Sequence, residues 1–336
     1  MNRLPDGALE HLRRIAEWPD LSGTRYQLEE LIGLGGMGWV FRAVDRELSR
    51  EVALKVLRTG AGDHDSMSRL RREARVLARL EHPGIVSVHD VGSLPDGRVY
   101  YVMKLVRGVR LDQQADDTAL PERLRLFLRI CETVAFAHAH GVIHRDLKPG
   151  NIMVGPFGEV LVMDWGIAKV REEQDPAPPR RDSAAQADSG REESWVGQTI
   201  EGTVLGTPGY MAPEQARGQI GLIDERTDVY ALGAILRYLV TGFDPTRPAA
   251  GSPRKAPPPL AAVVQKSQAS DPSARYAGAL DVAEEVARFL DARPVLAYRE
   301  GPLERVRRLA AKYQAAILLI LAYLAMRLLF LVTREL

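Results

Sequence analysis

Two short motifs constrain this chain more than any other part of its sequence. The first runs His144-Arg145-Asp146-Leu147-Lys148-Pro149-Gly150-Asn151, and the second, Asp164-Trp165-Gly166, follows shortly after it. Magnesium-dependent transfer of a phosphoryl group needs a carboxylate beside the attacking hydroxyl, a cation on the phosphate and hard oxygen ligands for the metal. The two motifs supply this set in Asp146, Lys148, Asn151 and Asp164. They therefore predict a phosphoryl-transfer site.

A glycine-rich segment near the start of the chain fits the same chemistry. It reads Ile32-Gly33-Leu34-Gly35-Gly36-Met37-Gly38, with Val40 shortly after it. Glycines let a hairpin lie close over phosphate groups, with backbone N–H groups directed at the anion. Alone the segment is weak evidence, because a structural turn explains a glycine cluster about as well. A strand that ends Val52-Ala53-Leu54-Lys55 follows it, and the two together indicate a nucleotide site.

Lys55 lies among apolar residues and therefore needs a carboxylate partner, because an unpaired buried ammonium group is costly. Glu73 lies on an amphipathic helix expected over residues 67–80, whereas Glu81 comes after the apolar periodicity ends. His82-Pro83 should stop that helix. We therefore expect Glu81 to face solvent and Glu73 to pair with Lys55.

Hydrophobic patterning divides the chain into a strand-rich part and a helix-rich part. Residues 26–56 carry short β-branched and apolar runs broken by glycine, and residues 86–91 and 99–106 return to strand character. Helical periodicity dominates later, most clearly over residues 121–140, 227–241 and 277–290. The pattern predicts a small sheet lobe followed by a large helical lobe.

On these motifs the chain resembles the protein kinase superfamily, specifically the bacterial eukaryotic-like (Hanks-type) Ser/Thr kinases, from about residue 26 to about residue 290. The resemblance implies an α+β bilobal fold. Residues 25–106 would form an antiparallel β-sheet lobe with one regulatory helix. Residues 107–292 would form a mainly helical lobe with a long activation loop at about 167–205. It also implies transfer of the γ-phosphate of ATP to Ser or Thr of protein substrates.

The resemblance assigns roles to individual residues. Lys55 would hold the α- and β-phosphates, Asp146 would orient the substrate hydroxyl, and Lys148 would neutralise the γ-phosphate. Asn151 and Asp164 would ligate Mg²⁺, with Mn²⁺ as an alternative. The residues expected to contact ATP are Ile32, Gly33, Leu34, Gly35, Gly36, Met37, Gly38, Val40, Ala53, Lys55, Met103, Lys104, Val106 and Met153.

Residues 206–214 resemble the segment that closes the activation loop and forms the platform for a peptide substrate. Glu214 in this segment is expected to form a buried ion pair with Arg275, and Asp228 is expected to anchor the backbone of the catalytic loop. Lys148, together with Thr207 before Pro208, follows the Ser/Thr pattern rather than the tyrosine-kinase pattern.

Activation by autophosphorylation is a further expectation. Arg145 lies beside Asp146, where a phosphate on the activation loop would best satisfy its positive charge. Thr199 and Thr203 are the expected acceptors, with residues 183–194 a less specific target. A homodimer would allow the reaction to occur in trans.

Two departures from the family pattern and two rival functions complete the sequence-based expectations. Trp165 replaces the phenylalanine usual in its motif, and its indole N–H needs a partner when buried. The proline-rich segment 245–259 stands where the kinase family usually has a longer stretch with a helix. It keeps open a catalytically weak or inactive scaffold of the same fold. A small-molecule kinase is the other rival, disfavoured by residues 206–214 and by Lys148.

Charge and cysteine content narrow the class of protein. The formal net charge is +1, so no global basic field indicates nucleic acid as a partner. The only cysteine, Cys131, lies in a helical apolar run and is expected to be a buried core residue in a reducing compartment. No secretory signal begins the sequence, so we expect a cytoplasmic N-terminus.

The two ends of the chain are expected to lie outside the catalytic lobes. Residues 1–24 should form an extension with a short helix, and residues 293–313 a basic linker. Residues 314–333 are an apolar run interrupted mainly by Tyr323 and Arg327, which predicts a hydrophobic helix that anchors the protein in the lipid bilayer of the cell membrane. A helix that binds a partner, in a cytoplasmic protein, is the alternative, because the apolar run is near the lower length limit for spanning.

Overall fold

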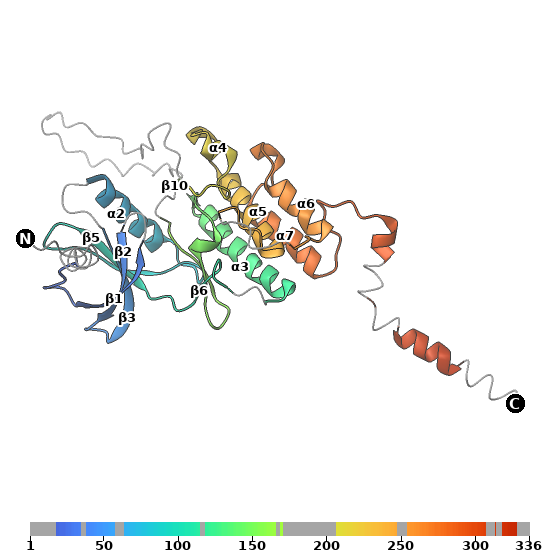
Figure 1. Cartoon of the computed structure of the whole chain (residues 1–336), viewed down its shortest axis with the longest axis horizontal. Helices are drawn as coiled ribbons and strands as arrows, with labels where there is room; N and C mark the ends of the chain where they lie inside the picture. The colour runs from blue at the N-terminus through green and yellow to red at the C-terminus, as the bar shows by residue number, and fades with distance from the viewer. Residues whose placement is uncertain are drawn as a thin grey trace, which may run out of the picture.

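The computed structural model of the chain describes residues 18–34, 38–57, 64–114, 118–165, 169–170, 206–246, 254–306, 313 and 318–327. These residues form a smaller lobe built on a β-sheet, the N-lobe, and a larger lobe of helices, the C-lobe (Figure 1). The expectation of an antiparallel sheet lobe followed by a helical lobe is confirmed. Of the extension expected over residues 1–24, the structure describes residues 18–24, and the short helix expected before them lies outside the described residues.

The N-lobe sheet has five antiparallel strands in the order β1-β2-β3-β5-β4. The strands are β1 (Tyr26–Leu34), β2 (Gly38–Asp45), β3 (Arg50–Leu57), β4 (Val88–Ser93) and β5 (Val99–Lys104), and the helix α2 (His64–Arg79) packs on the sheet. Strand β3 is central and buried on both faces from Val52 onward, which explains its unbroken run of apolar residues. Lys55 is the one charged residue inside that run.

Gly38 illustrates why the first hairpin requires glycine. A Cβ at this position would lie 2.2 Å from the backbone oxygen of Val56 on the neighbouring strand. Gly33, by contrast, has ordinary space for a Cβ, 3.5 Å from that of Val40. Packing therefore explains one glycine of the glycine-rich segment and leaves the other to be explained by function.

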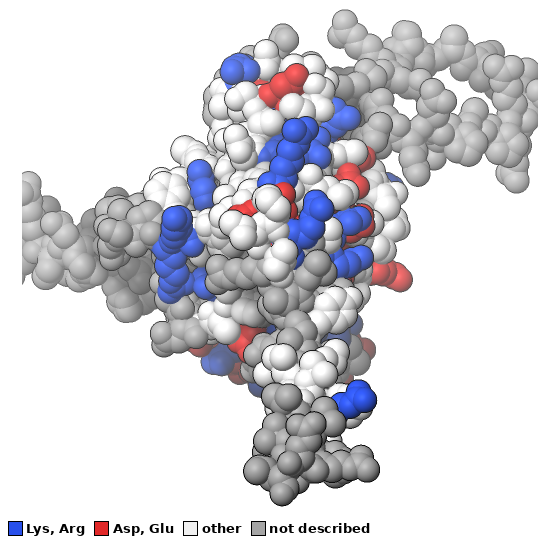
Figure 2. Space-filling model, turned by 90° about the vertical axis from the view of Figure 1, so that its right-hand side faces the viewer, with Lys and Arg blue, Asp and Glu red and all other residues white. Residues whose placement is uncertain are grey.

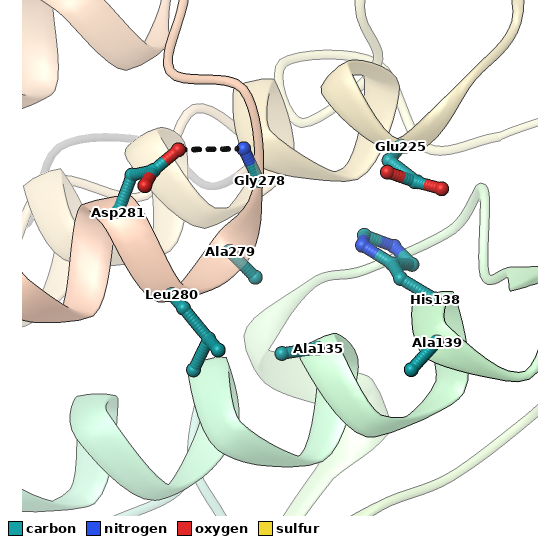
Figure 3. Close-up of a pocket in the computed structure, with 8 residues that line it drawn as sticks. All are labelled: Ala135, His138, Ala139, Glu225, Gly278, Ala279, Leu280 and Asp281. Atoms are coloured by element: carbon teal, nitrogen blue, oxygen red, sulfur yellow. Dashed lines mark hydrogen bonds between the residues drawn. The ribbon is translucent and has the colours of Figure 1, made fainter.

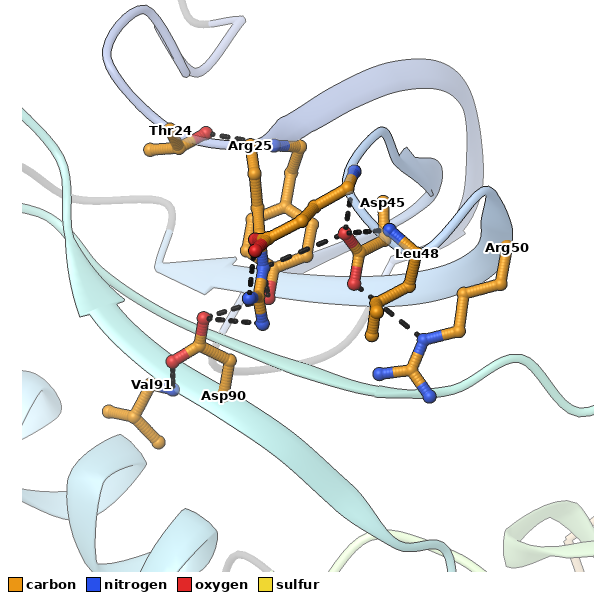
Figure 4. Close-up of polar contacts among 9 residues, drawn as sticks. Thr24, Arg25, Asp45, Leu48, Arg50, Asp90 and Val91 are labelled. Carbon is orange, nitrogen blue, oxygen red and sulfur yellow. Dashed lines mark hydrogen bonds and ion pairs between the residues drawn. The ribbon is translucent and has the colours of Figure 1, made fainter.

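A polar cluster ties the start of β1 to the β2–β3 turn and to β4 (Figure 4). Buried Asp45 accepts the backbone N–H groups of Glu47 and Leu48 and lies 3.6 Å from the guanidinium groups of both Arg25 and Arg50. Arg25 also reaches Asp90 on β4 at 3.4 Å. The cluster holds the outer end of the sheet together and lies away from the motifs discussed above.

The end of the N-terminal extension belongs to the N-lobe. Leu21 is buried in the hydrophobic core formed by the outer face of the sheet, and the Trp18 ring meets Phe41 edge to face at 4.9 Å. Described residues before β1 are therefore packed against the sheet.

The C-lobe is centred on three long helices. They are α3 (Leu120–Ala139), α5 (Glu225–Thr241) and α7 (Ala279–Leu290), with the shorter α4 (Pro213–Ala216) and α6 (Pro258–Ser267) beside them. The buried helix α5 begins where Asp224 accepts the backbone N–H of Arg226, and it ends at Gly242, whose φ of 75° only glycine adopts readily. The helices expected at 121–140, 227–241 and 277–290 are present within one or two residues.

Short strands follow the N-lobe sheet along the chain, before and after helix α3 of the C-lobe. They are β6 (Val109–Arg110), β7 (Val142–Ile143), β8 (Ile152–Val154), β9 (Val160–Val162) and β10 (Lys169–Val170), with the 3₁₀ turn η1 (Pro149–Asn151) just before β8. Two further 3₁₀ turns lie within the C-lobe, η2 (Ile220–Leu222) between α4 and α5 and η3 (Pro272–Ala274) between α6 and α7. Strands β6, β8 and β9 pair in that order. The sequence does not predict these strands, because a run of two or three residues is too short to show a hydrophobic period.

Segment 245–259 leads directly into a helix. Helix α6 begins at Pro258, with proline tolerated in its first turn. Its Leu260 and Val263 are fully buried in the C-lobe core.

The packed part of the C-lobe extends past residue 292, where the basic linker was expected to begin. Val295 is buried, and the backbone N–H of Ala297 donates to Glu285. Farther on, residues 318–327 form a helix that stands apart from both lobes (Figure 1), with all of its side chains exposed. Among the residues that the structure describes, no helix has both the length and the apolar character needed to cross a membrane.

Candidate active site

Lys55 and Glu73 meet in the interior of the N-lobe. The Lys55 ammonium group donates to both carboxylate oxygens of Glu73, at 2.8 and 3.0 Å, and both side chains are almost fully buried. Tyr101, which lies opposite Lys55 on β5, donates its hydroxyl to Glu73 at 2.9 Å. Tyr101 was not among the site residues predicted from the sequence. Glu81 is exposed, as predicted.

Lys55 remains positively charged in this environment. Burial by itself would lower the pKa of Lys55, but the nearby carboxylates of Glu73 and Asp164 outweigh burial and raise it. Asp164 lies 3.5 Å from the ammonium group and reaches it from the other lobe. Burial, and then Glu73, hold the pKa of Tyr101 well above its usual value, so its hydroxyl stays a donor.

Asp146 is the centre of a compact polar network at the mouth of the C-lobe. Its carboxylate accepts the Lys148 ammonium group at 2.8 Å, the Thr207 hydroxyl at 2.8 Å and the Asn151 amide at 3.2 Å. Lys148 also donates to the Thr207 hydroxyl at 2.7 Å. The catalytic-loop motif and the 206–214 segment, far apart in sequence, are joined here by hydrogen bonds.

The backbone that carries Asp146 is fixed from beneath by Asp228 on α5. The buried Asp228 carboxylate accepts the backbone N–H groups of His144 and Arg145, at 2.8 and 2.9 Å, and the His138 ring at 2.8 Å. Burial favours a raised pKa for Asp228, but the His138 contact and the Arg145 N–H lower it overall, so the carboxylate stays charged. Arg145 has a φ of 70°, and this anchoring stabilises its left-handed backbone.

Trp165 is locked into the C-lobe beneath Asp164. Its indole N–H donates to the backbone oxygen of Val162 at 3.1 Å, and its ring lies 4.6 Å from that of His144, which is itself buried. The indole therefore has the partner that the sequence analysis required. Asp164, with a φ of 58°, is held in a left-handed conformation, and its carboxylate is 62% exposed toward the space between the lobes.

The donor set at the mouth of the C-lobe fits a hard divalent cation. Asn151 uses its amide nitrogen on Asp146, which leaves its amide oxygen as an acceptor, and the Asp164 carboxylate is exposed. No group of three His, Cys, Asp or Glu side chains suited to a metal occurs among the described residues. Magnesium in phosphoryl-transfer sites usually takes only one or two protein carboxylates and completes its shell with phosphates and water.

Five of the residues expected around adenine belong to one hydrophobic cluster: Val40, Ala53, Met103, Val106 and Met153. Ala53 pairs with Met103 across β3 and β5, both buried, and Val40 pairs with Lys55 across β2 and β3. Met153 on β8 and Val106 are half-buried, and Lys104 is exposed. Ile32 and Leu34 are exposed on β1, while Gly35, Gly36 and Met37 lie outside the described residues.

The 206–214 segment is secured to the C-lobe at its far end. Glu214 and Arg275 form a bidentate ion pair with both distances at 2.7 Å, and their side chains are 3% and 0% exposed. Burial opposes ionisation of Glu214, but its contacts with Arg275 lower its pKa overall. Gln215, which directly follows the segment, donates to the backbone oxygen of Arg145 at 2.8 Å and so supports the catalytic loop.

A surface depression elsewhere in the C-lobe lies apart from this site. Ala135, His138 and Ala139 of α3, Glu225 of α5 and residues 278–281 line it (Figure 3). His138 turns its ring to Asp228, so the depression borders the structural support of the catalytic loop and not the reacting groups. Thr199 and Thr203 lie outside the described residues.

Comparison with known proteins places these features in one family. Residues 26–256 match the protein kinase domain family. The chain is 36% identical over 301 residues to the serine/threonine-protein kinase PknD of Chlamydia felis, covering 80% of this chain and 31% of that protein. It is 36% identical over 302 residues to PknD of Chlamydia trachomatis serovar L2b, covering 80% of this chain and 32% of that protein. The chain thus spans about a third of the length of these curated relatives.

A solved structure agrees with the sequence comparisons. The crystal structure of the Mycobacterium tuberculosis PknI kinase domain superposes with a TM-score of 0.54 at 26% sequence identity. The superposition covers 79% of this chain and 95% of that one.

Proposed function

This chain belongs to the protein kinase family, and we propose that it transfers the γ-phosphate of ATP to serine or threonine of protein substrates. One observation carries the proposal: Asp146, Lys148 and Thr207 form a closed hydrogen-bonded network at the mouth of the C-lobe. That network puts a carboxylate and a cation beside the segment that would support a peptide. The Lys55–Glu73 pair provides the second cation on the opposite side of the space between the lobes.

The residues divide the work of the reaction between them. Lys55 would hold the α- and β-phosphates, while Glu73 and Tyr101 fix the position of its ammonium group. Asp146 would accept a hydrogen bond from the substrate hydroxyl and orient its oxygen toward the γ-phosphate, and Lys148 would balance charge on that phosphate. Positioning does most of this catalysis, because the transition state is loose and its charge is spread over the phosphate oxygens.

Asn151 and Asp164 would hold Mg²⁺, or Mn²⁺ in its place, through the amide oxygen and the carboxylate. When bound, the metal supplies positive charge that neutralises the phosphates. The adenine ring would lie between Val40 and Ala53 above and Met153 below, with Met103 at the back and the backbone of Lys104 and Val106 at its edge.

Two rival functions make different predictions in one assay. The purified chain, incubated with Mg-ATP and a library of Ser-, Thr- and Tyr-containing peptides, should give phosphoserine or phosphothreonine and no phosphotyrosine. A scaffold would give no product under any condition. A small-molecule kinase would leave the peptides unmodified while consuming ATP in the presence of a metabolite mixture.

We also propose that phosphorylation of Thr199 or Thr203 activates the enzyme. Arg145 supports this idea, because it directly precedes Asp146 and its backbone is bound on both sides, by Asp228 and by Gln215. A phosphate that binds the Arg145 guanidinium group would therefore further stabilise the position of the catalytic loop. Mass spectrometry of active protein should find phosphate on one or both threonines, with transfer between two copies of the chain. If active protein carries neither modification, this part of the proposal is wrong.

We further propose that residues 314–333 associate with a membrane and keep the kinase lobes on the cytoplasmic side. Residues 318–327 support this, because Leu318, Leu319, Ile320, Leu321 and Leu324 are each more than half exposed. The face of the C-lobe toward this end of the chain carries several Lys and Arg side chains (Figure 2), which would favour an anionic surface. Arg327→Leu should strengthen membrane partitioning and Leu321→Arg should abolish it. Release of the intact chain by carbonate would instead indicate a partner-binding helix.

A further inference from the structure

The most informative feature outside the catalytic residues is an arginine on strand β6 whose side chain packs against the catalytic loop. Arg110 ends the short strand β6, which pairs with β8 so that Arg110 is opposite Met153. A Cβ built on Gly150 would lie 3.0 Å from the terminal nitrogen of Arg110. Gly150 thus lets the guanidinium group lie flat against the loop, one residue before Asn151.

The guanidinium group is held in place and yet open to solvent. Asp112 accepts two hydrogen bonds from it, at 2.9 and 2.6 Å, in a fork that fixes the plane of the group. The Asp112 side chain is only 7% exposed, whereas that of Arg110 is 46% exposed. The carboxylate therefore lies beneath the arginine, and the outer face of the cation is free to meet another molecule.

The position of Arg110 near Asp146 suggests which part of a bound peptide it would meet. The Asn151 amide donates to the backbone oxygen of Asp146 and to its carboxylate oxygen Oδ2, so Arg110, which lies against Gly150, is one residue along the chain from a group that contacts Oδ2. The Thr207 hydroxyl, from the 206–214 segment, donates to the other carboxylate oxygen, Oδ1. A peptide whose acceptor hydroxyl reaches Asp146 while one flank lies on residues 206–214 must carry its other flank past Arg110.

Two more basic residues lie between the end of β5 and the start of β6. Lys104 and Arg107 are both exposed on the chain that leads into β6, with Arg107 paired to Glu51. An extended chain advances about 3.3 Å per residue, so residues two to four from the acceptor fall about 7 to 13 Å away. An arginine side chain can meet an acidic or phosphorylated side chain at that range.

We propose that Arg110 is a specificity-determining residue that selects acceptor peptides with an anionic side chain two to four residues from the Ser or Thr, on the flank away from residues 206–214. This inference rests on the proposed Ser/Thr kinase activity. Gly150 is needed for this role, because a longer side chain at that position would displace the Arg110 guanidinium group from the loop. Arg110 acts through substrate binding and takes no part in the chemical step.

The test uses the full chain and a set of peptides with one central serine. Each peptide carries a single glutamate at one position from four residues before the serine to four after it, in an otherwise neutral sequence. We expect kcat/KM to rise roughly three- to tenfold for glutamate at one or more positions of one flank only. Lysine at the same position should lower kcat/KM by a similar factor.

Variants assign the effect to Arg110. Arg110→Gln should abolish the preference through peptide KM while leaving the KM for Mg-ATP unchanged, and Arg110→Lys should keep part of it. Arg293→Gln is the matched control, since Arg293 is 45% exposed and paired with Asp291. It should leave the preference intact.

The outcomes separate this inference from the function it rests on. If no peptide is phosphorylated by the unaltered chain, the proposed function fails. Phosphorylation without any positional preference for glutamate, or a preference that survives Arg110→Gln, overturns the role of Arg110 and leaves the kinase assignment standing.

Discussion

The buried ion pair between Glu214 and Arg275 gives a prediction whose size follows from the structure. Glu214→Ala leaves the Arg275 guanidinium group fully buried without its carboxylate. Removing one member of such a pair typically costs about 3 to 5 kcal/mol of unfolding free energy. Arg275 keeps bonds to the backbone oxygens of Ala269 and Arg226, at 2.8 and 2.9 Å, so we expect the lower end of that range.

The reverse change isolates the charge. Arg275→Met leaves a buried carboxylate that retains only the hydroxyl of Thr227, at 3.1 Å, among its contacts with neighbouring side chains. We therefore expect a cost at the upper end, about 4 to 5 kcal/mol. The double variant Glu214→Ala with Arg275→Met should cost much less than the two single changes added together, because neither charge is then left alone.

Equilibrium unfolding in urea measures these differences in unfolding free energy. The transition can be followed by tryptophan fluorescence, to which buried Trp165 contributes, and checked by circular dichroism. Activity assayed below the unfolding transition reports whether residues 206–214 have moved. A cost below about 1 kcal/mol for both single variants, or additive costs in the double variant, would refute the reasoning.

Three further predictions follow from the same site. Lys55→Met should remove phosphoryl transfer while nucleotide still binds, since the residues proposed to contact adenine lie elsewhere. Isothermal titration with ATP and a transfer assay on one sample check this, and retained activity would contradict it. Trp165→Phe should lose the bond to Val162 and lower the unfolding free energy by about 1 kcal/mol, measured in urea against Trp39→Phe as a buried control. The pKa values of Glu214 and Asp228 are lowered in the folded protein, so the stability that these carboxylates add is present above their ordinary pKa values near 4 and is lost as pH falls through their folded pKa values. Asp228→Asn should therefore reduce the dependence of the unfolding free energy on pH in the acid range. An unchanged dependence would contradict the role of Asp228.

The sequence predicted those parts of the site in which a buried charged group requires a partner of opposite charge. A buried lysine within an apolar strand requires a carboxylate, and the helical period separated Glu73 from Glu81 without any coordinates. The long helices were predictable for a similar reason, since α3, α5 and α7 each bury one face over many residues. Their boundaries depended on caps such as Asp224 and Gly242.

Features fixed by tertiary packing could not be read from the sequence. Tyr101 reaches Glu73 only because β3 and β5 are neighbours in that register. The placement of Arg110 on Gly150 depends on a pairing of β6 with β8 that is too short to have a period. Helix α6 follows a proline-rich segment whose composition indicates a loop. Each case depends on which elements lie side by side, and local propensity says little about that.

The central claim is that Asp146, Asn151 and Asp164 form a metal-assisted phosphoryl-transfer site, and Asp164→Asn tests it most directly. The exposed Asp164 carboxylate forms an ion pair with Lys55 at 3.5 Å, so the substitution should leave the unfolding free energy within about 1 kcal/mol of the unaltered chain. Transfer of phosphate from Mg-ATP to a peptide should fall by at least about a hundredfold in this folded variant. Undiminished transfer by folded Asp164→Asn protein would contradict the account.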